Sequence, residues 1–253
     1  GRQRCGAMTD ITPQFLRAHP LPVLPSESDK TARGQVLVVA GGPQVPGAAL
    51  LSGLGALRAG AGKLQIAATA GYAAHLALAV PEARVLTVAA RPSGEIAPDA
   101  AEDLKDGLGR CDAVVVGPGM MDDVAAGALI ARLASLDTRA RFVVDAAALT
   151  GLCDAHDLSA IAGRTVFTPH AGEMAGLLGW DKVRIDADPV EAARVAAQKW
   201  NAVVVMKGVT THVVTPGGLV WRHEGGSQGL GTSGSGDVLA GVIGGLLARG
   251  AAP

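Results

Sequence analysis

Aromatic side chains and cysteines are scarce in this chain of 253 residues. Three Trp, three Phe and one Tyr are too few for the base-stacking surfaces that bind single-stranded nucleic acids. The three cysteines, Cys5, Cys111 and Cys153, lie far apart and form neither a metal-binding spacing nor an even set for disulfides. Such usage is typical of reduced thiols, and we expect a cytoplasmic protein.

Excess charge and long apolar runs are also lacking. The net charge is −1 at pH 7 and the pI is about 6.7, which argues against a partner held by bulk charge. The apolar run at 238–248 is too short to span a bilayer, and Gly, Pro and Gln interrupt the uncharged run at 34–57. No secretory signal pattern opens the sequence. We therefore expect neither a membrane nor a nucleic acid as a partner.

Small and aliphatic residues dominate instead. Hydrophobic residues make up 49% of the chain, and glycine contributes 35 residues. A length of 253 residues fits one large α/β domain with a sizeable core. We expect residues 1–8 to be a remnant of cloning and residues 9–253 to form a single domain. Its polar, proline-rich start at 9–33 is expected to be an N-terminal arm.

Short apolar runs alternate with helical patterns along the rest of the chain. The uninterrupted Val-rich runs predict strands buried on both faces, and hence a mainly parallel sheet between helices. The turn signal at 215–218 predicts that the last two strands form an antiparallel hairpin. The expected strands are 36–40, 64–68, 85–89, 113–116, 142–144, 165–167, 203–206, 212–214 and 219–221. The expected helices are 47–60, 72–79, 99–107, 122–135, 171–178, 188–200 and 237–249.

Chemically suggestive residues follow five of the expected strands. They are residues 41–42, 117–119, Asp145, 168–170 and 207–208. Each of them alone fits an ordinary turn as well as it fits a site. Parallel strands end at one edge of their sheet, where ligands bind in open α/β folds. The five together therefore predict a site along that edge.

A loop of small residues at 231–236 leads Asp237 into the first turn of an apolar helix. The backbone N–H groups of such a loop, together with a helix N-terminus, attract a phosphate group. A carboxylate at this position can deprotonate a hydroxyl that attacks phosphorus, so the pattern predicts phosphoryl transfer. The alternative is that Asp237 merely caps the helix. Glycines at 229, 231 and 234 match the one-letter pattern of a dinucleotide-binding fingerprint. However, no strand runs directly into them and no acidic residue follows Asp237.

Four other side chains each have two interpretations. His170 is either a satisfied interior histidine or part of the site, and Glu173 either complements a helix N-terminus or belongs to the site. Asp145 either caps a helix or orients a water molecule on a metal. Lys207 is either a solvated residue of a hairpin turn or the start of a nucleotide-phosphate loop that includes the hydroxyls of Thr210 and Thr211.

Six stretches, at 34–68, 114–120, 143–152, 168–179, 203–218 and 229–250, together resemble the ribokinase-like superfamily. The last stretch, GLGTSGSGDVLAGVIGGLLARG, is specific to that superfamily. GALRAGAGK at 55–63 and TPHAGEM at 168–174 narrow the resemblance to the ADP- or ATP-dependent NAD(P)H-hydrate dehydratases. The resemblance covers nearly all of residues 30–250. It implies a three-layer α/β/α sandwich with a mainly parallel central sheet and a C-terminal antiparallel hairpin.

The resemblance also implies roles for individual residues. Asp237 would act as the base toward the C6 hydroxyl of hydrated NAD(P)H, beside an anion hole for the transferred phosphoryl group. ADP or ATP would be the co-substrate with Mg²⁺, which Glu173 would hold through water, and the assembly would be a homotetramer. The implied anion hole is Gly234, Ser235 and Gly236; the nucleotide contacts are Lys207, Gly208, Val209, Thr210, Thr211 and Gly236; the substrate contacts are Ala48, Gly119, His170 and Asp237.

The chain departs from the family pattern at four positions. Ser227 and Gln228 replace Asn-Pro, Gly231 replaces Ala, and Met121 replaces a glycine. Relatives usually continue for about another helix beyond the position of Pro253, so a truncated C-terminus is expected. Two other functions share the Asp237 loop. One is a kinase for a hydroxymethyl vitamin precursor or a sugar. The other is a nucleotide-binding homologue without catalysis, in which the altered segments have lost the substrate.

Overall fold

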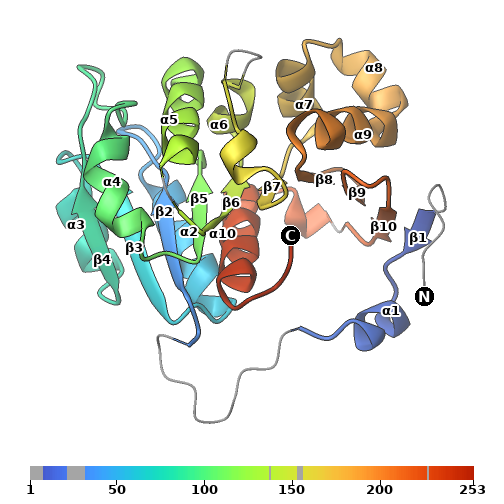
Figure 1. Cartoon of the computed structure of the whole chain (residues 1–253), viewed down its shortest axis with the longest axis horizontal. Coiled ribbons are helices and arrows are strands. Elements are labelled where there is room, and N and C mark those ends of the chain that lie inside the picture. Colours follow the sequence, from blue (N-terminus) through green and yellow to red (C-terminus); the bar gives the residue numbers. More distant parts are fainter. Residues whose placement is uncertain (1–7, 22–31, 137, 153–155, 227) are drawn as a thin grey trace.

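All ten strands of the described residues join in one sheet, in the order β1-β10-β9-β8-β7-β6-β5-β2-β3-β4 (Figure 1). The computed structural model describes residues 8–21, 32–136, 138–152, 156–226 and 228–253. The strands are β1 (Met8–Asp10), β2 (Gln35–Val39), β3 (Lys63–Ala68), β4 (Ala83–Thr87), β5 (Ala113–Val116), β6 (Arg141–Val144), β7 (Thr165–Phe167), β8 (Val203–Met206), β9 (Thr210–Val214) and β10 (Val220–Glu224).

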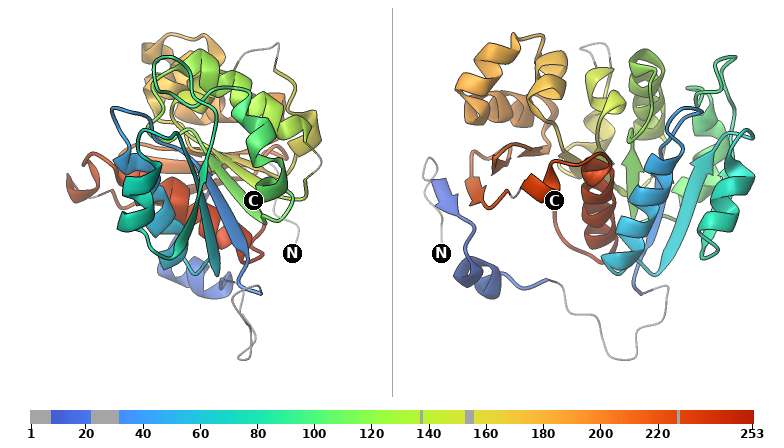
Figure 2. Two further views of the ribbon diagram at one scale, coloured as in Figure 1. Left: turned by 90° about the vertical axis from the view of Figure 1, so that its left-hand side faces the viewer. Right: turned by 180° about the vertical axis from the view of Figure 1, so that it is seen from behind.

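Helices cover both faces of this sheet (Figure 2). α2, α3 and α10 pack on one face, and α4, α5, α6, α7 and α9 pack on the other. Among the described residues, none of the helices combines the length and apolar character needed to cross a membrane. The helices are α1 (Pro13–Ala18), α2 (Gly47–Arg58), α3 (Ala73–Ala79), α4 (Ala100–Leu108), α5 (Asp123–Ser135), α6 (Ala147–Thr150), α7 (Ala171–Leu178), α8 (Lys182–Ala187), α9 (Pro189–Trp200) and α10 (Ser235–Ala248).

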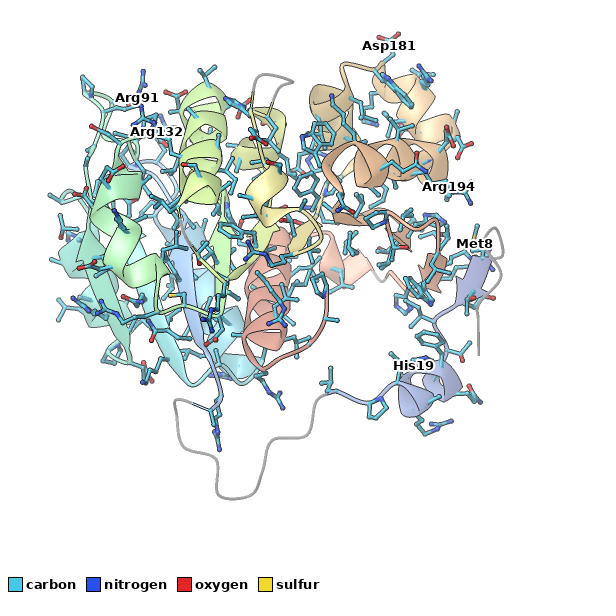
Figure 3. The ribbon with its side chains drawn as sticks, viewed as in Figure 1. Met8, His19, Arg91, Arg132, Asp181 and Arg194 are labelled. Atoms are coloured by element: carbon cyan, nitrogen blue, oxygen red, sulfur yellow. The ribbon has the colours of Figure 1, made fainter. Side chains whose placement is uncertain are left out.

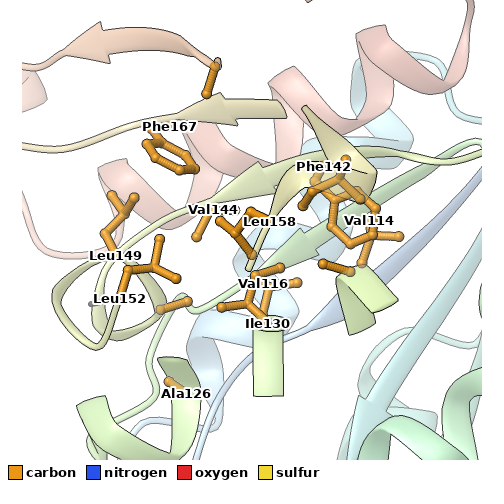
Figure 4. Close-up of a cluster of buried hydrophobic side chains, with 14 of the residues drawn as sticks. Val114, Val116, Ala126, Ile130, Phe142, Val144, Leu149, Leu152, Leu158 and Phe167 are labelled. Atoms are coloured by element: carbon orange, nitrogen blue, oxygen red, sulfur yellow. The ribbon is translucent and has the colours of Figure 1, made fainter. Parts of the chain in front are cut away.

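The central strands are buried on both faces. Successive residues of β2 alternate between two cores: Val36 and Val38 belong to the core under α2 and α10, whereas Leu37 and Val39 belong to the other. Figure 4 shows part of that second core, in which β5 and β6 pack against Ile130 of α5. This burial explains why the expected strands 36–40, 113–116 and 142–144 consist of apolar residues alone.

The predicted three-layer α/β/α sandwich, its mainly parallel sheet and the C-terminal hairpin are confirmed. Strands β2 to β8 pair in parallel with their neighbours, and β9 pairs antiparallel with β10. β8 and β9 also pair antiparallel, as the interpretation of Lys207 as part of a hairpin turn requires. The chain therefore reverses direction at Lys207–Val209, between the parallel and antiparallel parts of the sheet.

Among the strands and α-helices, β1, α1 and α8 are not expected from the sequence, whereas α6 is the helix considered after Asp145. β1 has three residues and pairs in parallel with β10, with Met8 opposite Val220, so a partner 212 positions away defines it. Met8 and His19, labelled in Figure 3, lie on this N-terminal segment, where the sequence predicts only an irregular arm and a remnant that includes Met8. α1 is capped by Thr12 but buries no residue, so no apolar periodicity indicates it. Cys5, Cys153 and Ser227 lie outside the described residues.

Candidate active site

One edge of the sheet collects the residues that follow its parallel strands. β8, β7, β6, β5 and β2 are consecutive neighbours in the sheet, so the five predicted post-strand segments lie side by side. The backbone N–H of Lys207 donates a hydrogen bond of 2.8 Å to the carbonyl of Pro169, which extends the pairing of β7 and β8 beyond their ends. The predicted convergence at this edge is thus confirmed.

A cavity of about 800 Å³ opens between this edge and the first turn of α10. A volume of this size suits a small-molecule ligand such as a nucleotide. Thr210, Gly234, Ala48 and Gly119 are not part of the lining that the described residues form. The lining comprises Asp145, Ala146, His170, Glu173, Lys207, Gly208, Val209, Thr211, His223, Gly226, Leu230, Gly231, Ser235, Gly236, Asp237 and Leu239.

Asp237 projects from the first turn of α10 into this cavity. The helix begins after Gly234, whose φ of 85° is left-handed, and no side chain caps it. The interpretation of Asp237 as a helix cap is therefore wrong. Burial raises the pKa of the Asp237 carboxyl above its usual range; the negative charges of Asp145 and Glu173 also raise it, while Lys207 opposes them. A carboxyl with a raised pKa is a better proton acceptor near neutral pH.

Lys207 lies between two carboxylates. Its ammonium is 3.0 Å from Oδ1 of Asp145 and 3.5 Å from Oε2 of Glu173, and its side chain is only 20% exposed. Lys207 does begin the turn between β8 and β9, but the interpretation as a solvated lysine is wrong. The two carboxylates hold the Lys207 ammonium at the wall of the cavity, where it can bind an anion.

Asp145 is buried at the end of β6, with 2% of its surface exposed. Its Oδ1 accepts hydrogen bonds from Thr168 Oγ1 at 2.7 Å and from Lys207 Nζ at 3.0 Å. α6 begins after Ala146 and has no side-chain cap, so the interpretation of Asp145 as a helix cap is wrong. The alternative, a water molecule oriented on a metal, stays a prediction.

His170 and Glu173 form a reciprocal cap at the start of α7. Nδ1 of His170 accepts from the backbone N–H groups of Gly172 and Glu173, and Oε2 of Glu173 accepts from the N–H of His170 at 2.8 Å. The side chain of His170 is 58% exposed, so it is not an interior histidine. The expected complement of Glu173 to the helix N-terminus is confirmed. Both residues also line the cavity, and their roles toward substrate and metal stay predictions.

Ala48 and Gly119 lie against each other beside the start of α2. Ala48 is 1% exposed, and a Cβ built on Gly119 would overlap the Cβ of Ala48. Gly119 has a φ of 69°, which favours glycine in this close contact. The structure thus explains the glycine by packing, and contact of either residue with a substrate stays a prediction.

Sequence reasoning missed His223, Leu230 and Leu239 of the lining. His223 stands opposite Thr211 in the pairing of β9 with β10. Extending the predicted hairpin by two pairs would have placed His223 beside the predicted nucleotide loop. Leu230 and Leu239 carry no comparable signal, because single leucines beside a glycine-rich loop are equally typical of packing.

The model of the family described as NAD(P)H-hydrate dehydratase matches residues 36–253. The chain belongs to this family. A relative from Xanthomonas campestris pv. campestris, the ADP-dependent (S)-NAD(P)H-hydrate dehydratase, is 46% identical over 245 residues, which are 95% of this chain and 80% of that protein. The bifunctional NAD(P)H-hydrate repair enzyme Nnr of Moorella thermoacetica is 37% identical over 92% of this chain, which spans only 44% of that longer protein.

Solved structures with the same fold also match the chain. The ADP/ATP-dependent NAD(P)H-hydrate dehydratase from Bacillus subtilis, co-crystallised with ATP/Mg²⁺, is 28% identical with a TM-score of 0.78, over 97% of this chain and 83% of that one. A ribokinase-like superfamily protein from Enterococcus faecalis has a TM-score of 0.79 at 22% identity over 98% of this chain and 83% of that one, which shows the fold alone. The resemblance carried by the six stretches is confirmed as family membership.

Proposed function

We propose that the chain catalyses the nucleotide-dependent dehydration of hydrated NAD(P)H. The hydroxyl at C6 of the hydrated ring attacks the terminal phosphorus of ADP or ATP, and the nucleotide leaves with one phosphate fewer. The C6–O bond then breaks, phosphate departs with the bonding electrons, and loss of a proton from C5 restores the ring double bond. Phosphorylation thus converts a poor leaving group into a good one.

The observation that carries this proposal is that Asp237 and Lys207 line the same cavity in a member of this family. Asp237 takes the proton of the attacking hydroxyl, for which its raised pKa suits it. The N–H of Gly236 at the start of α10 receives the negative charge of the transferred group. The N–H of Ser235 donates to the carbonyl of Thr232 at 3.3 Å, and it would exchange this partner for the phosphoryl group. The ammonium of Lys207 faces the phosphates of the nucleotide, and Gly208–Thr211 continues that loop.

The oxygen donors at the cavity suit Mg²⁺. This ion prefers one or two carboxylates together with phosphate oxygens and water. Oε2 of Glu173 accepts from the N–H of His170, whereas among the described residues Oε1 of Glu173 lies 3.5 Å from Nε2 of the His170 ring and accepts no hydrogen bond. Glu173 would therefore hold the ion through water at Oε1. When bound, the ion supplies positive charge to the phosphates of the nucleotide.

Membership of the dehydratase family favours this function over a kinase that retains its phosphate on the product. The relative from Xanthomonas campestris pv. campestris is named as ADP-dependent, which supports ADP as the first nucleotide to test. A cytoplasmic location and a homotetramer belong to the same proposal, on family resemblance. Light scattering of the purified protein tests the tetramer.

The decisive experiment mixes the purified protein with hydrated NADH, Mg²⁺ and either ADP or ATP. The absorbance of the reduced nicotinamide should recover, with one free phosphate released per dinucleotide repaired. Nucleotide consumption with a stable phosphorylated product would instead show a kinase. Nucleotide binding without turnover on any substrate would show the homologue without catalysis.

A further inference from the structure

The carboxylate of Asp145 is held by more contacts than its ion pair with Lys207 alone. Its Oδ1 accepts from both Thr168 Oγ1 at 2.7 Å and Lys207 Nζ at 3.0 Å, and all three side chains come from the ends of neighbouring strands. The hydroxyl of Thr168 is itself buried, with 1% of that residue exposed. Because the hydroxyl and the ammonium share one oxygen, the hydroxyl fixes the position at which the ammonium is held.

The backbone at Asp145 is held in an unusual conformation. Ala146 has a φ of 48° and a ψ of −127°, a strained region that residues with a Cβ rarely occupy. Gly117 packs against the backbone of Asp145, so closely that a Cβ on Gly117 would overlap the carbonyl of Asp145. The N–H of Asp145 also donates to the carbonyl of Val116 at 3.0 Å. Strain and close packing together fix the direction of this carboxylate.

The ammonium that Asp145 holds lies beside the anion-binding turn of α10. A Cβ built on Gly236 would lie 3.5 Å from Lys207 Nζ and 4.0 Å from Oδ2 of Asp145. A lysine has a flexible stem with several rotamers, so a fixed partner is needed to keep its charge at one place. Glu173 is more distant from the ammonium, at 3.5 Å, and its nearer oxygen is shared with the N–H of His170.

We propose that Asp145 and Thr168 are positioning residues for nucleotide binding, which hold the Lys207 ammonium against the first turn of α10, where it meets the phosphate tail. The inference rests on the proposed nucleotide site. Oδ1 of Asp145 and Oγ1 of Thr168 bond to each other and not to the nucleotide, so both residues act through Lys207. Their contribution therefore exists only while Lys207 is present.

A double-mutant cycle between Thr168 and Lys207 tests this dependence. Thr168→Val removes the hydroxyl with little change of volume, Thr168→Ser keeps it, and Lys207→Met removes the charge. The binding constant of ADP with Mg²⁺ is measured by calorimetry in each variant, so the readout does not depend on turnover. Thr165→Val is the matched control. Thr165 is as buried as Thr168 and begins the strand that Thr168 follows, but its hydroxyl donates to the carbonyl of Ile161 instead.

Thr168→Val should weaken ADP binding about tenfold, which is the effect expected from losing a hydrogen bond to a charged group. Thr168→Ser and Thr165→Val should bind ADP as the wild type does. In the Lys207→Met background, Thr168→Val should have no further effect. In turnover, the KM for ADP should rise while the KM for hydrated NADH stays unchanged. Asp145→Asn should show the same dependence on Lys207.

The inference is overturned if Thr168→Val binds ADP normally, or if it weakens binding equally with and without Lys207. Failure of the wild type to bind ADP would overturn both the nucleotide site and this inference. If the cycle behaves as expected but hydrated NADH is not repaired, the positioning role stands and the proposed dehydration fails. Circular dichroism of each variant confirms that the fold is retained.

Discussion

The hydroxyl of Ser52 on α2 donates a hydrogen bond of 3.0 Å to the backbone carbonyl of Asp237 on α10. The same two helices pack so closely that a Cβ on Gly241 would overlap the carbonyl of Ser52. This contact fixes the first turn of α10, and therefore Asp237, relative to the sheet. The glycines of α10 thus serve the site indirectly, by allowing the helix to approach α2.

Gly241→Ala should force α2 and α10 apart. Overpacking against backbone atoms costs about 1–3 kcal/mol of unfolding free energy, and the displacement of Asp237 should lower turnover as well. Chemical denaturation and the dehydration assay measure the two effects. Gly47→Ala, at the start of α2, is the control, because a Cβ there meets no atom within 4 Å. Equal stability of the two variants would contradict the packing argument.

Lys207→Ala should raise the KM for the nucleotide and destabilise the fold. The substitution removes the positive charge from between Asp145 and Glu173, and an unpaired buried carboxylate costs about 3 kcal/mol. The nucleotide titration and thermal unfolding measure both effects. Lys182→Ala, which removes a lysine paired on the exposed surface with Asp186, should change neither. An unchanged KM in Lys207→Ala would remove this loop from the site.

The sequence predicts most of the fold because buried strands and helices leave characteristic patterns of apolar residues. β5 is found residue for residue at 113–116, and α7 at 171–178, since a Val-rich run and a helix bounded by His170 and Gly179 each carry a local signal. β1 could not be predicted, because its pairing with β10 depends on a contact that no local pattern records. α8, with one buried residue, lacks the apolar stripe that predicts a helix.

The sequence predicts several of the residues that line the cavity but not their contacts. Post-strand positions and family motifs place Asp237, Lys207, His170 and Glu173 at one edge. That Lys207 bonds to Asp145 could not be read from the sequence, because 62 residues separate them and each fits other roles. The strained conformation of Ala146 is equally invisible, since alanine carries no signal for a positive φ.

Asp237→Asn should lower turnover about a thousandfold, the scale of a lost general base together with some lost positioning. Asparagine keeps the shape of the side chain but accepts no proton. Nucleotide affinity should stay near that of the wild type, because we expect no contact between this carboxylate and the nucleotide in the ground state. Single-turnover kinetics and calorimetry separate the two quantities. A loss of less than tenfold would show that another group takes the proton.

The raised pKa of Asp237 gives activity and stability opposite dependences on pH. The base must be ionised, so kcat/KM should fall as the pH falls through this raised pKa, above the range of an ordinary aspartate. Between its unfolded and folded pKa values the native state binds more protons at this group than the unfolded state. Ionising it therefore costs folding free energy as the pH rises through that window.

Asp237→Asn removes that cost and should raise the melting temperature at neutral pH. The gain should shrink as the pH falls through the window and vanish below the ordinary pKa of aspartate, where both forms are neutral. Thermal unfolding of the two proteins across this range measures the difference. Asp181→Asn, at the residue before α8 and outside the lining of the cavity, is the control for the substitution itself. A difference in melting temperature between wild type and Asp237→Asn that is the same at every pH would show that side-chain shape, and not ionisation, accounts for the gain. Burial could then no longer explain the strength of Asp237 as a base.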